Sequence, residues 1–313
     1  MNRTTLTLAT QRRLAATVVE NLPDRVSEED ALYWLANKGK LKELLDRVLI
    51  LSPTGWLDRL VQSEEDAHRA FFGETFDLAQ FHNTLERYGE ERVGQWAILG
   101  LQPHFLPKLI LTQDSKFRGW KIKPEDWFWQ QVAAGSIMRR NAADGLEIVK
   151  EVGFDGVTVL IDTRCKPAYD GGRQSFGPVP DLLLGTLIEA LRNEGKIARY
   201  EYGEQSSRFG VSSREWDEHV RPALEALPVF KDVAFRLEMT IEANCIPQMY
   251  KRMPRKKDGQ TNTWVWYEEF FEGESNRLHG GYSGDGGLAN VFYNDVDAHW
   301  NRRAVRPLGV LLP

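Results

Sequence analysis

Side chains suited to recognition are concentrated in one stretch near the C-terminal end of the sequence. Between Phe292 and Arg303 the chain reads FYNDVDAHWNRR, which combines large aromatic groups with Asn, Asp, His and Arg. Aromatic groups supply contact area at a small entropy cost, and amide and carboxylate groups supply adaptable hydrogen bonds. The stretch follows neither a helical nor a strand period, so we interpret it as a binding surface.

Residue patterns for catalysis or metal binding are missing from the sequence. The histidines show no ligand spacing such as HxxxH, and no GxGxxG, P-loop or GxSxG motif occurs. Asp295 and Asp297 lack the glycine and distal glutamate of an EF-hand calcium loop. Cys165 and Cys245 form no CxxC pattern, and nothing near either indicates an activated thiolate. We therefore expect no catalytic residue, no metal ion and no cofactor.

The residue types from Ser275 to Pro313 are restricted. This segment contains no Glu, Lys, Met or Gln, although the preceding chain is rich in Glu and Lys. Randomising the adenines of Asn codons gives Phe, Tyr, Asn, Asp, Val, Ala, His, Ser, Gly and Arg, and never Glu, Lys, Met, Gln or Trp. Every residue from Phe292 to His299 belongs to the reachable set, whereas Trp300 does not. The pattern favours diversification of this stretch around a fixed Trp300.

The order RLxGGxSxxGGLAxV, a variable stretch and then RPLxVL resembles the variable region in target proteins of diversity-generating retroelements, especially those from uncultured bacterial lineages. The matching segments are Arg277–Ser283, Gly286–Val291 and Arg306–Leu311. Upstream, Thr261–Phe270 resembles the strand that precedes this region in such proteins. In that family a reverse transcriptase copies a template with errors at adenine, and the copy replaces the variable region.

This resemblance implies a C-type-lectin fold of the formylglycine-generating-enzyme type, with a variable region at about residues 282–305. It also implies a non-catalytic protein that binds an unknown protein or other macromolecular ligand. The expected ligand-binding residues are Tyr282, Asn290, Phe292, Tyr293, Asn294, Asp295, Asp297, His299, Asn301 and Arg302. The expected framework residues are Gly280, Gly281, Gly286, Gly287, Trp300, Arg306 and Pro307.

The elements that must position this surface are expected in residues 151–313, which we predict to be the lectin-like domain. A strand at Val157–Ile161 precedes two helices, which begin near Asp181 and at Ser212, where Glu215 completes a capping box. Strands follow at 233–241, 263–271, 288–293 and 305–312. A C-type-lectin fold pairs its first and last strands, so the terminal strand is expected beside Val157–Ile161.

Residues 1–150 are expected to form a mostly helical N-terminal domain, which makes the whole chain an α+β protein. Apolar residues at helical spacing predict helices at about 41–49, 64–72 and 78–88. Short strands are expected at 97–99 and 109–111. The tryptophans that follow are expected to pack a seam between the domains rather than form a stacking platform; they are Trp120, Trp127 and Trp129.

Composition is typical of a soluble globular protein, with 42% hydrophobic residues, 27% charged residues and a net charge of −5. No apolar run could span a bilayer and no signal-peptide core is present, which predicts a cytoplasmic location and no membrane partner. The negative charge disfavours nucleic acid. Basic runs at 116–123 and 251–257 keep a nucleic-acid-associated module as one alternative. An enzyme on the same fold is the other, and the oligomeric state is left open.

Overall fold

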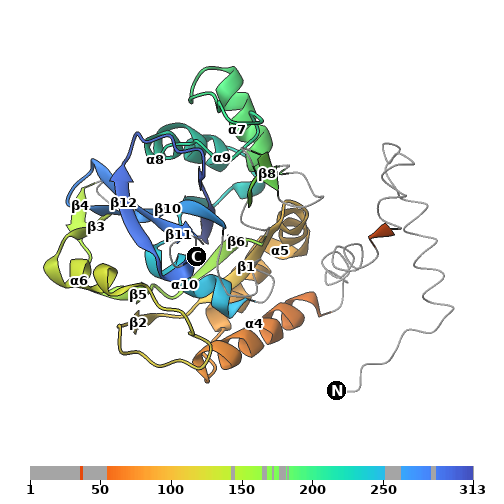
Figure 1. The fold of residues 1–313 in the computed structure, drawn as a ribbon. Helices are drawn as coiled ribbons and strands as arrows, with labels where there is room; N and C mark the ends of the chain where they lie inside the picture. The colour runs from red at the N-terminus through yellow and green to blue at the C-terminus, as the bar shows by residue number, and fades with distance from the viewer. Residues whose placement is uncertain are drawn as a thin grey trace, which may run out of the picture. The chain divides into compact units, whose positions relative to one another are not determined.

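The computed structural model describes residues 36–37, 55–141, 145–163, 168–170, 173–175, 181, 183–250, 262–282 and 287–312. Contacts between Cα atoms divide the chain into two compact units, Met1–Ile50 and Leu51–Pro313. Every element labelled in Figure 1 belongs to the second unit. The predicted helix at 41–49 lies outside the described residues.

The described helices of the second unit come before the first strand and between later strands. They are α4 (Trp56–Phe72), α5 (Ala79–Ile98), α6 (Asp126–Ala134), α7 (Leu184–Asn193), α8 (Ser213–Glu215), α9 (Arg221–Glu225) and α10 (Thr240–Met249). A π-helical turn at Trp216–Val220 joins α8 to α9, and 3₁₀ turns lie at Pro228–Phe230 and Gly287–Ala289. In Figure 1, α4 and α5 lie next to β1, whereas α7, α8 and α9 gather at the opposite end of the unit.

The strands form two main sheets and two short ribbons. The first sheet has the order β1 (Leu101–Leu106), β6 (Val157–Asp162), β14 (Pro307–Leu311), β9 (Val233–Leu237). The second has the order β12 (Val291–Asp295), β11 (Asn276–Tyr282), β10 (Asn262–Phe271), β3 (Ile137–Arg140), β4 (Leu146–Ile148), with β13 (Arg303–Ala304) parallel to β10. The ribbons pair β2 (Leu109–Leu111) with β5 (Val152–Phe154) and β7 (Ala168–Asp170) with β8 (Arg173–Ser175).

The last strand pairs with the clearest strand of the sequence. In this antiparallel pair Leu308 lies opposite Ile161 and Val310 lies opposite Val159. The apolar run of β6 is buried on both faces, which accounts for its continuous Val, Leu and Ile content. The prediction that the terminal strand lies beside Val157–Ile161 is confirmed, and so is the α+β class.

Local signals in the sequence identify several element ends correctly. The side chain of Ser212 accepts from the backbone N–H of Glu215, and the Glu215 carboxylate accepts from the N–H of Ser212. This is the predicted capping box. Gly195, at φ 71°, follows α7 as the predicted helix stop.

Other predicted elements differ from the structure. The strand expected at 233–241 ends at Leu237, because Glu242 accepts from the N–H of Met239 and starts α10 there. Residues 97–99 end α5 and its cap rather than forming a strand. The stretch from Phe292 to Arg303, which was expected to follow no strand period, begins inside β12. Strand β11 was not predicted, because Gly280 and Gly281 weaken its β signal.

The predicted domain boundary near residue 150 does not coincide with a division of the structure. Strand β1 pairs with β6, and β3 pairs with β10, so segments from either side of residue 150 share both main sheets. The apolar side chains of Leu101 and Ile137 are buried in these sheets. The division between compact units instead falls between Ile50 and Leu51.

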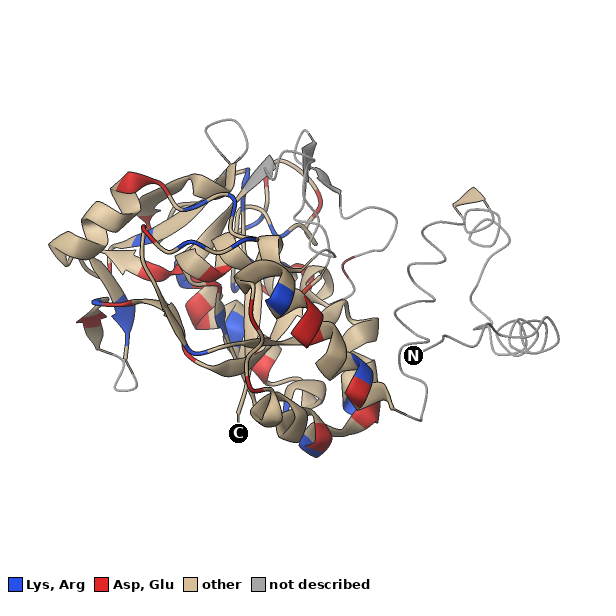
Figure 2. Ribbon diagram, turned by 90° about the horizontal axis from the view of Figure 1, so that it is seen from below, with Lys and Arg blue, Asp and Glu red and all other residues tan. Residues whose placement is uncertain are grey.

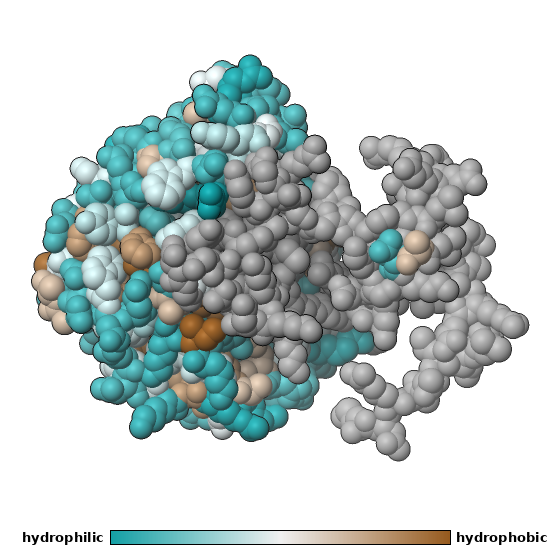
Figure 3. Space-filling model, in the orientation of Figure 1, coloured by the Kyte–Doolittle hydropathy of each residue, from teal (hydrophilic) through white to brown (hydrophobic). Residues whose placement is uncertain are grey.

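Two apolar clusters fill the second unit. One includes Phe71, Phe128 and Leu278, and the other joins Leu85 and Trp216 to the sheets. Figure 2 shows basic and acidic residues intermixed along the described elements. Figure 3 shows a largely hydrophilic face with scattered apolar positions. No described helix has both the length and the apolar content needed to cross a bilayer.

Candidate functional site

The candidate site is built on β12, which ends the described part of the second sheet. Strand β12 pairs only with β11 in that sheet, with His279 opposite Phe292 and Leu278 opposite Tyr293. An edge strand presents the side chains of both its faces and one open backbone edge. The segment 296–302 then leads from β12 to β13. We define residues 291–302 as the display segment.

The two aromatic residues of β12 point to opposite faces of the sheet, as the period of a strand requires. The Phe292 ring meets Trp264 edge to face, with ring centroids 5.4 Å apart. The Tyr293 ring stacks on Phe271 at 4.1 Å and lies 6.0 Å from Trp127, nearly parallel to it. Both remain exposed, Phe292 by 44% and Tyr293 by 46%. The exposed rings of Phe292 and Tyr293 are therefore each packed against aromatic rings that are buried or half-buried.

Helix α6 fastens the start of the display segment. Glu125, the residue before this helix, donates its backbone N–H to the carbonyl of Ala289 at 2.9 Å. The Glu125 carboxylate accepts from the N–H of Val291 at 2.7 Å. These two bonds hold α6 against the beginning of β12, and the helix thereby brings Trp127 to Tyr293. The sequence-based interpretation of Trp127 as seam packing missed this placement.

The region around α8 fastens the rest of the display segment. The N–H of Arg214 donates to the carbonyl of Val296, and its guanidinium forms a bidentate pair with Asp297, with Nε 2.5 Å from Oδ1. His299 Nε2 lies 3.0 Å from the Glu215 carboxylate. The hydrogen bond and charge of Glu215 raise the pKa of His299 above its usual value. The segment is thus tied to the scaffold at several points.

Most of the predicted ligand-binding residues lie on the surface. Phe292, Tyr293, Asp295, Asp297, His299 and Arg302 are exposed, and Asn294 and Asn301 are half-buried. Asn290 differs from the prediction because it is only 4% exposed and lies between the 3₁₀ turn and β12. The side chain of Tyr282 lies outside the described residues. Asp297 and His299 already have scaffold partners, which leaves Phe292 and Tyr293 as the main exposed anchors.

The predicted framework residues are mostly packed against backbone or buried groups. A Cβ atom on Gly280 would overlap the carbonyl oxygen of Asn290, so only glycine fits there. Gly281 and Gly287 have φ of 91° and 68°, which glycine adopts without strain. Arg306 and Pro307 are buried, and Gly286 lies outside the described residues. Trp300 is 46% exposed and therefore belongs to the surface, not to the interior.

Arg303 lies behind Trp300 and is fully buried. Its guanidinium carbon is 4.0 Å from the centroid of the Trp266 ring and 4.5 Å from that of Trp300. Nη2 donates to Nε2 of His279 at 3.1 Å. Burial and the charge of Arg303 keep the pKa of His279 well below its usual value, so the imidazole is neutral and can accept. The sequence placed Arg303 in the polar stretch but gave no sign of its burial.

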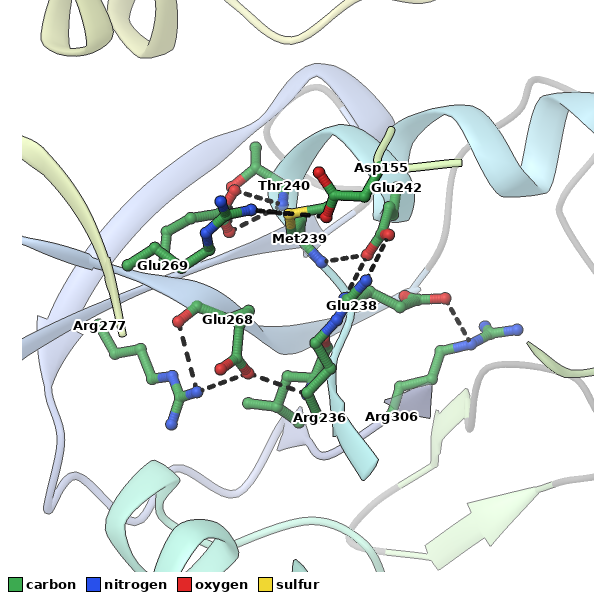
Figure 4. Close-up of polar contacts among 12 residues, drawn as sticks. Asp155, Arg236, Glu238, Met239, Thr240, Glu242, Glu268, Glu269, Arg277 and Arg306 are labelled. Carbon is green, nitrogen blue, oxygen red and sulfur yellow. Dashed lines mark hydrogen bonds and ion pairs between the residues drawn. The ribbon is translucent and has the colours of Figure 1, made fainter. Parts of the chain in front are cut away.

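A buried network of charges supports the sheet beneath the display segment (Figure 4). Arg277 of β11 donates to the carbonyl of Tyr267 at 2.8 Å, to Asp217 at 2.7 Å and to Glu268 at 2.9 Å. On another side of this network, Arg306 lies 3.4 Å from Glu238. The bonds of Arg277 link β11 to β10 and to the π-helical turn, and the pair of Arg306 and Glu238 joins the residue before β14 to the residue after β9. None of them was predicted, because charged side chains are rarely this buried.

The network continues at the start of α10 (Figure 4). Arg236 forms a bidentate pair with Glu242, with nitrogen–oxygen distances of 2.5 and 2.7 Å. Glu269 accepts from the backbone N–H and the hydroxyl of Thr240. Burial raises the pKa of Glu269 to about 7, and Glu242 adds to the effect, although the Thr240 hydrogen bonds act in the opposite direction. Glu269 is consequently a buried carboxyl that titrates near neutral pH.

The alternative functions rest on cysteines and on basic runs. Cys245 is buried in α10, where desolvation raises the pKa of its thiol, and Cys165 lies outside the described residues. In the first basic run Lys123 donates to the carbonyls of Gln113 and Ser115 and lies over the buried Trp120. The second run, 251–257, is likewise outside the described residues. Across the described ranges no group of three or more His, Cys, Asp or Glu side chains is placed to hold a metal ion.

Comparison with known proteins adds no assignment: no family model, no curated protein and no solved structure matches the chain.

Proposed function

We propose that the chain is the target protein of a diversity-generating retroelement and that its display segment binds a protein or other macromolecular ligand. The observation that carries the proposal is that residues which adenine mutagenesis can reach are exposed on an edge strand. The aromatic side chains of that strand pack against Trp264 and Phe271 of strand β10 in the same sheet. Phe292 and Tyr293 supply large rigid anchors on the two faces of β12. Half-buried amides at Asn294 and Asn301 add polar groups around them.

A rigid scaffold is what such a surface requires. Ordering a flexible loop on binding costs free energy, so a segment that is already fixed binds more tightly for the same contacts. The display segment is fixed at its start by Glu125 and along its length by Arg214 and Glu215. Changes at its exposed positions leave the core untouched and should each cost within about 0.5 kcal/mol of stability.

The fold that we propose for the second unit is a C-type-lectin fold of the formylglycine-generating-enzyme type. Its support is the pairing of β6 with β14, the first and last strands of the predicted lectin-like region, together with the position of the glycine motifs directly before β12. An enzymatic role has weaker support, because the thiol of Cys245 is buried and protonated. A role in nucleic-acid binding is weakened by the internal hydrogen bonds of Lys123.

A pair of display libraries tests the proposed function. The first library randomises Phe292, Tyr293, Asn294, Asp295 and Arg302 within the set reachable from Asn codons. The matched control library randomises the same number of exposed positions on α4 and α5: Arg59, Asp66, Glu86, Arg87 and Glu91. Both are panned against a purified folded protein, hen egg-white lysozyme.

We expect most members of the first library to fold, as judged by protease resistance, and to yield specific lysozyme binders far more often than the control library. The reason is that the first set offers aromatic anchors on a fixed edge strand. Widespread loss of folding in the first library, or binders at no greater frequency than in the control, would contradict the proposal.

A further inference from the structure

Arg303 is a buried cation for which the described protein supplies no counter-charge. Its side chain has no exposed surface, and of its three nitrogens only Nη2 has a hydrogen-bond partner among the described residues, the neutral His279. Nε and Nη1 are both left without an acceptor. Removing a guanidinium from water without pairing it is costly, and proteins rarely leave such a group uncompensated.

Other buried arginines of the second unit are compensated by backbone carbonyls or by carboxylates. Arg192 donates to the carbonyls of Ala198, Gln205, Ser207 and Phe209. Arg208 pairs with Asp162 and Asp181, and Arg277 pairs with Asp217 and Glu268. Arg303 instead lies between two indole rings, Trp266 and Trp300. Burial lowers the pKa of its guanidinium, but the group remains charged at neutral pH. Its Nε and Nη1 lack an acceptor in the described part of the chain, and an anion would therefore supply the acceptor and the counter-charge together.

The unpaired donors lie directly behind the display segment. Trp300 covers the guanidinium with a ring that is itself 46% exposed, and Phe292 flanks the same face through Trp264 and His279. Displacement of the half-exposed Trp300 ring would uncover the guanidinium to a group arriving from outside. An unpaired N–H donor such as that of Nη1 can donate to an oxygen of a carboxylate, and the charges of the two groups strengthen that bond.

We propose that Arg303 is the anchoring cation of the ligand site and pairs with a carboxylate that a protein ligand presents on an Asp or Glu side chain. This inference rests on the proposed function, because it names the chemistry recognised by the same surface. The aromatic groups around the guanidinium exclude water and thereby strengthen the pair. The site thus combines apolar contact at Phe292 and Trp300 with one buried charge interaction.

A peptide selection and a double-mutant cycle test this assignment. A random linear peptide library is panned against the wild-type protein, and the selected peptides are retained if Phe292→Ser or Trp300→Ala weakens their binding. We expect Asp or Glu at one fixed position in these peptides. Replacing that residue by Asn or Gln should weaken binding to wild type about 10- to 100-fold. The same replacement should change binding to Arg303→Met by less than about threefold.

Two further measurements guard against a trivial loss of folding. Arg303→Met should have a thermal midpoint at or above that of wild type, because it removes an uncompensated buried charge. Arg199→Met, at an exposed site, should change neither the midpoint nor peptide affinity. A markedly lower midpoint for Arg303→Met would show that the guanidinium is already compensated and would overturn the inference. If the retained peptides show no preference for Asp or Glu, the inference is overturned but the proposed function still stands. If Phe292→Ser and Trp300→Ala weaken the binding of no selected peptide, that result counts against both.

Discussion

Arg277→Met is expected to lower the free energy of unfolding by about 3–5 kcal/mol at pH 7. The reason is that the buried acceptors of Arg277 would remain out of water without a hydrogen-bond donor. Arg277 is fully buried and donates to Glu268, Asp217 and the carbonyl of Tyr267. Met fills a similar volume but supplies no donor, so the buried Glu268 carboxylate loses its counter-charge. Urea denaturation at pH 7, followed by tryptophan fluorescence, measures the difference.

The matched control is Arg199→Met, which removes an exposed arginine and should change stability by less than about 0.5 kcal/mol. Arg277→Lys should lie between the two, because lysine keeps the charge but cannot reach several acceptors in the fork geometry of a guanidinium. Equal stabilities for Arg277→Met and Arg199→Met would mean that the buried network does not hold the sheet beneath the display segment.

Glu269→Gln is expected to stabilise the protein increasingly as the pH rises from about 4.5 to 7. The pKa of Glu269 is raised from 4.5 to about 7 by burial, so the folded state keeps a proton that the unfolded state releases over this range. The wild type therefore loses stability across this window, by about 3 kcal/mol for a shift of that size. Gln is neutral at every pH and can still accept from Thr240.

The measurement is the difference in unfolding free energy between Glu269→Gln and wild type at pH 5 and at pH 8. The difference should be larger at pH 8 and should stop growing above pH 7, once the folded carboxyl is ionised. Glu86→Gln, which makes the same change at an exposed position on α5, is the matched control. A Glu269→Gln difference that is the same at both pH values would mean that this carboxyl is ionised throughout, with an ordinary pKa.

Some of these features could be predicted from local sequence. The β-branched run Val157–Ile161 and the apolar end of the chain were identified as strands, and their pairing follows in the structure. The Ser212 capping box was likewise predicted, because its chemistry involves residues only three apart. The exposure of Phe292 and Tyr293 agrees with the interpretation of their stretch as a surface.

Other features depend on contacts between distant residues and left no local signal. The strand was expected to continue to Ile241, but the Glu242 carboxylate accepts from the N–H of Met239 and caps the start of α10 there. Trp127 reaches Tyr293 only because Glu125 binds the start of β12. Arginine is a residue type that usually lies at the surface, and Arg277 and Arg303 become buried only through tertiary packing.

The central claim, that the display segment is rewritten from a template, is tested most directly by sequencing the DNA around the gene. We predict a near-copy of the codons for residues 282–305 close by, differing almost only where the template has adenine, beside a reading frame for a reverse transcriptase. The differences should fall on exposed positions such as Phe292 and Tyr293 and should spare Gly287 and Leu288. Flanking DNA with no such copy, or a copy whose differences are spread evenly over all four bases, would contradict the account.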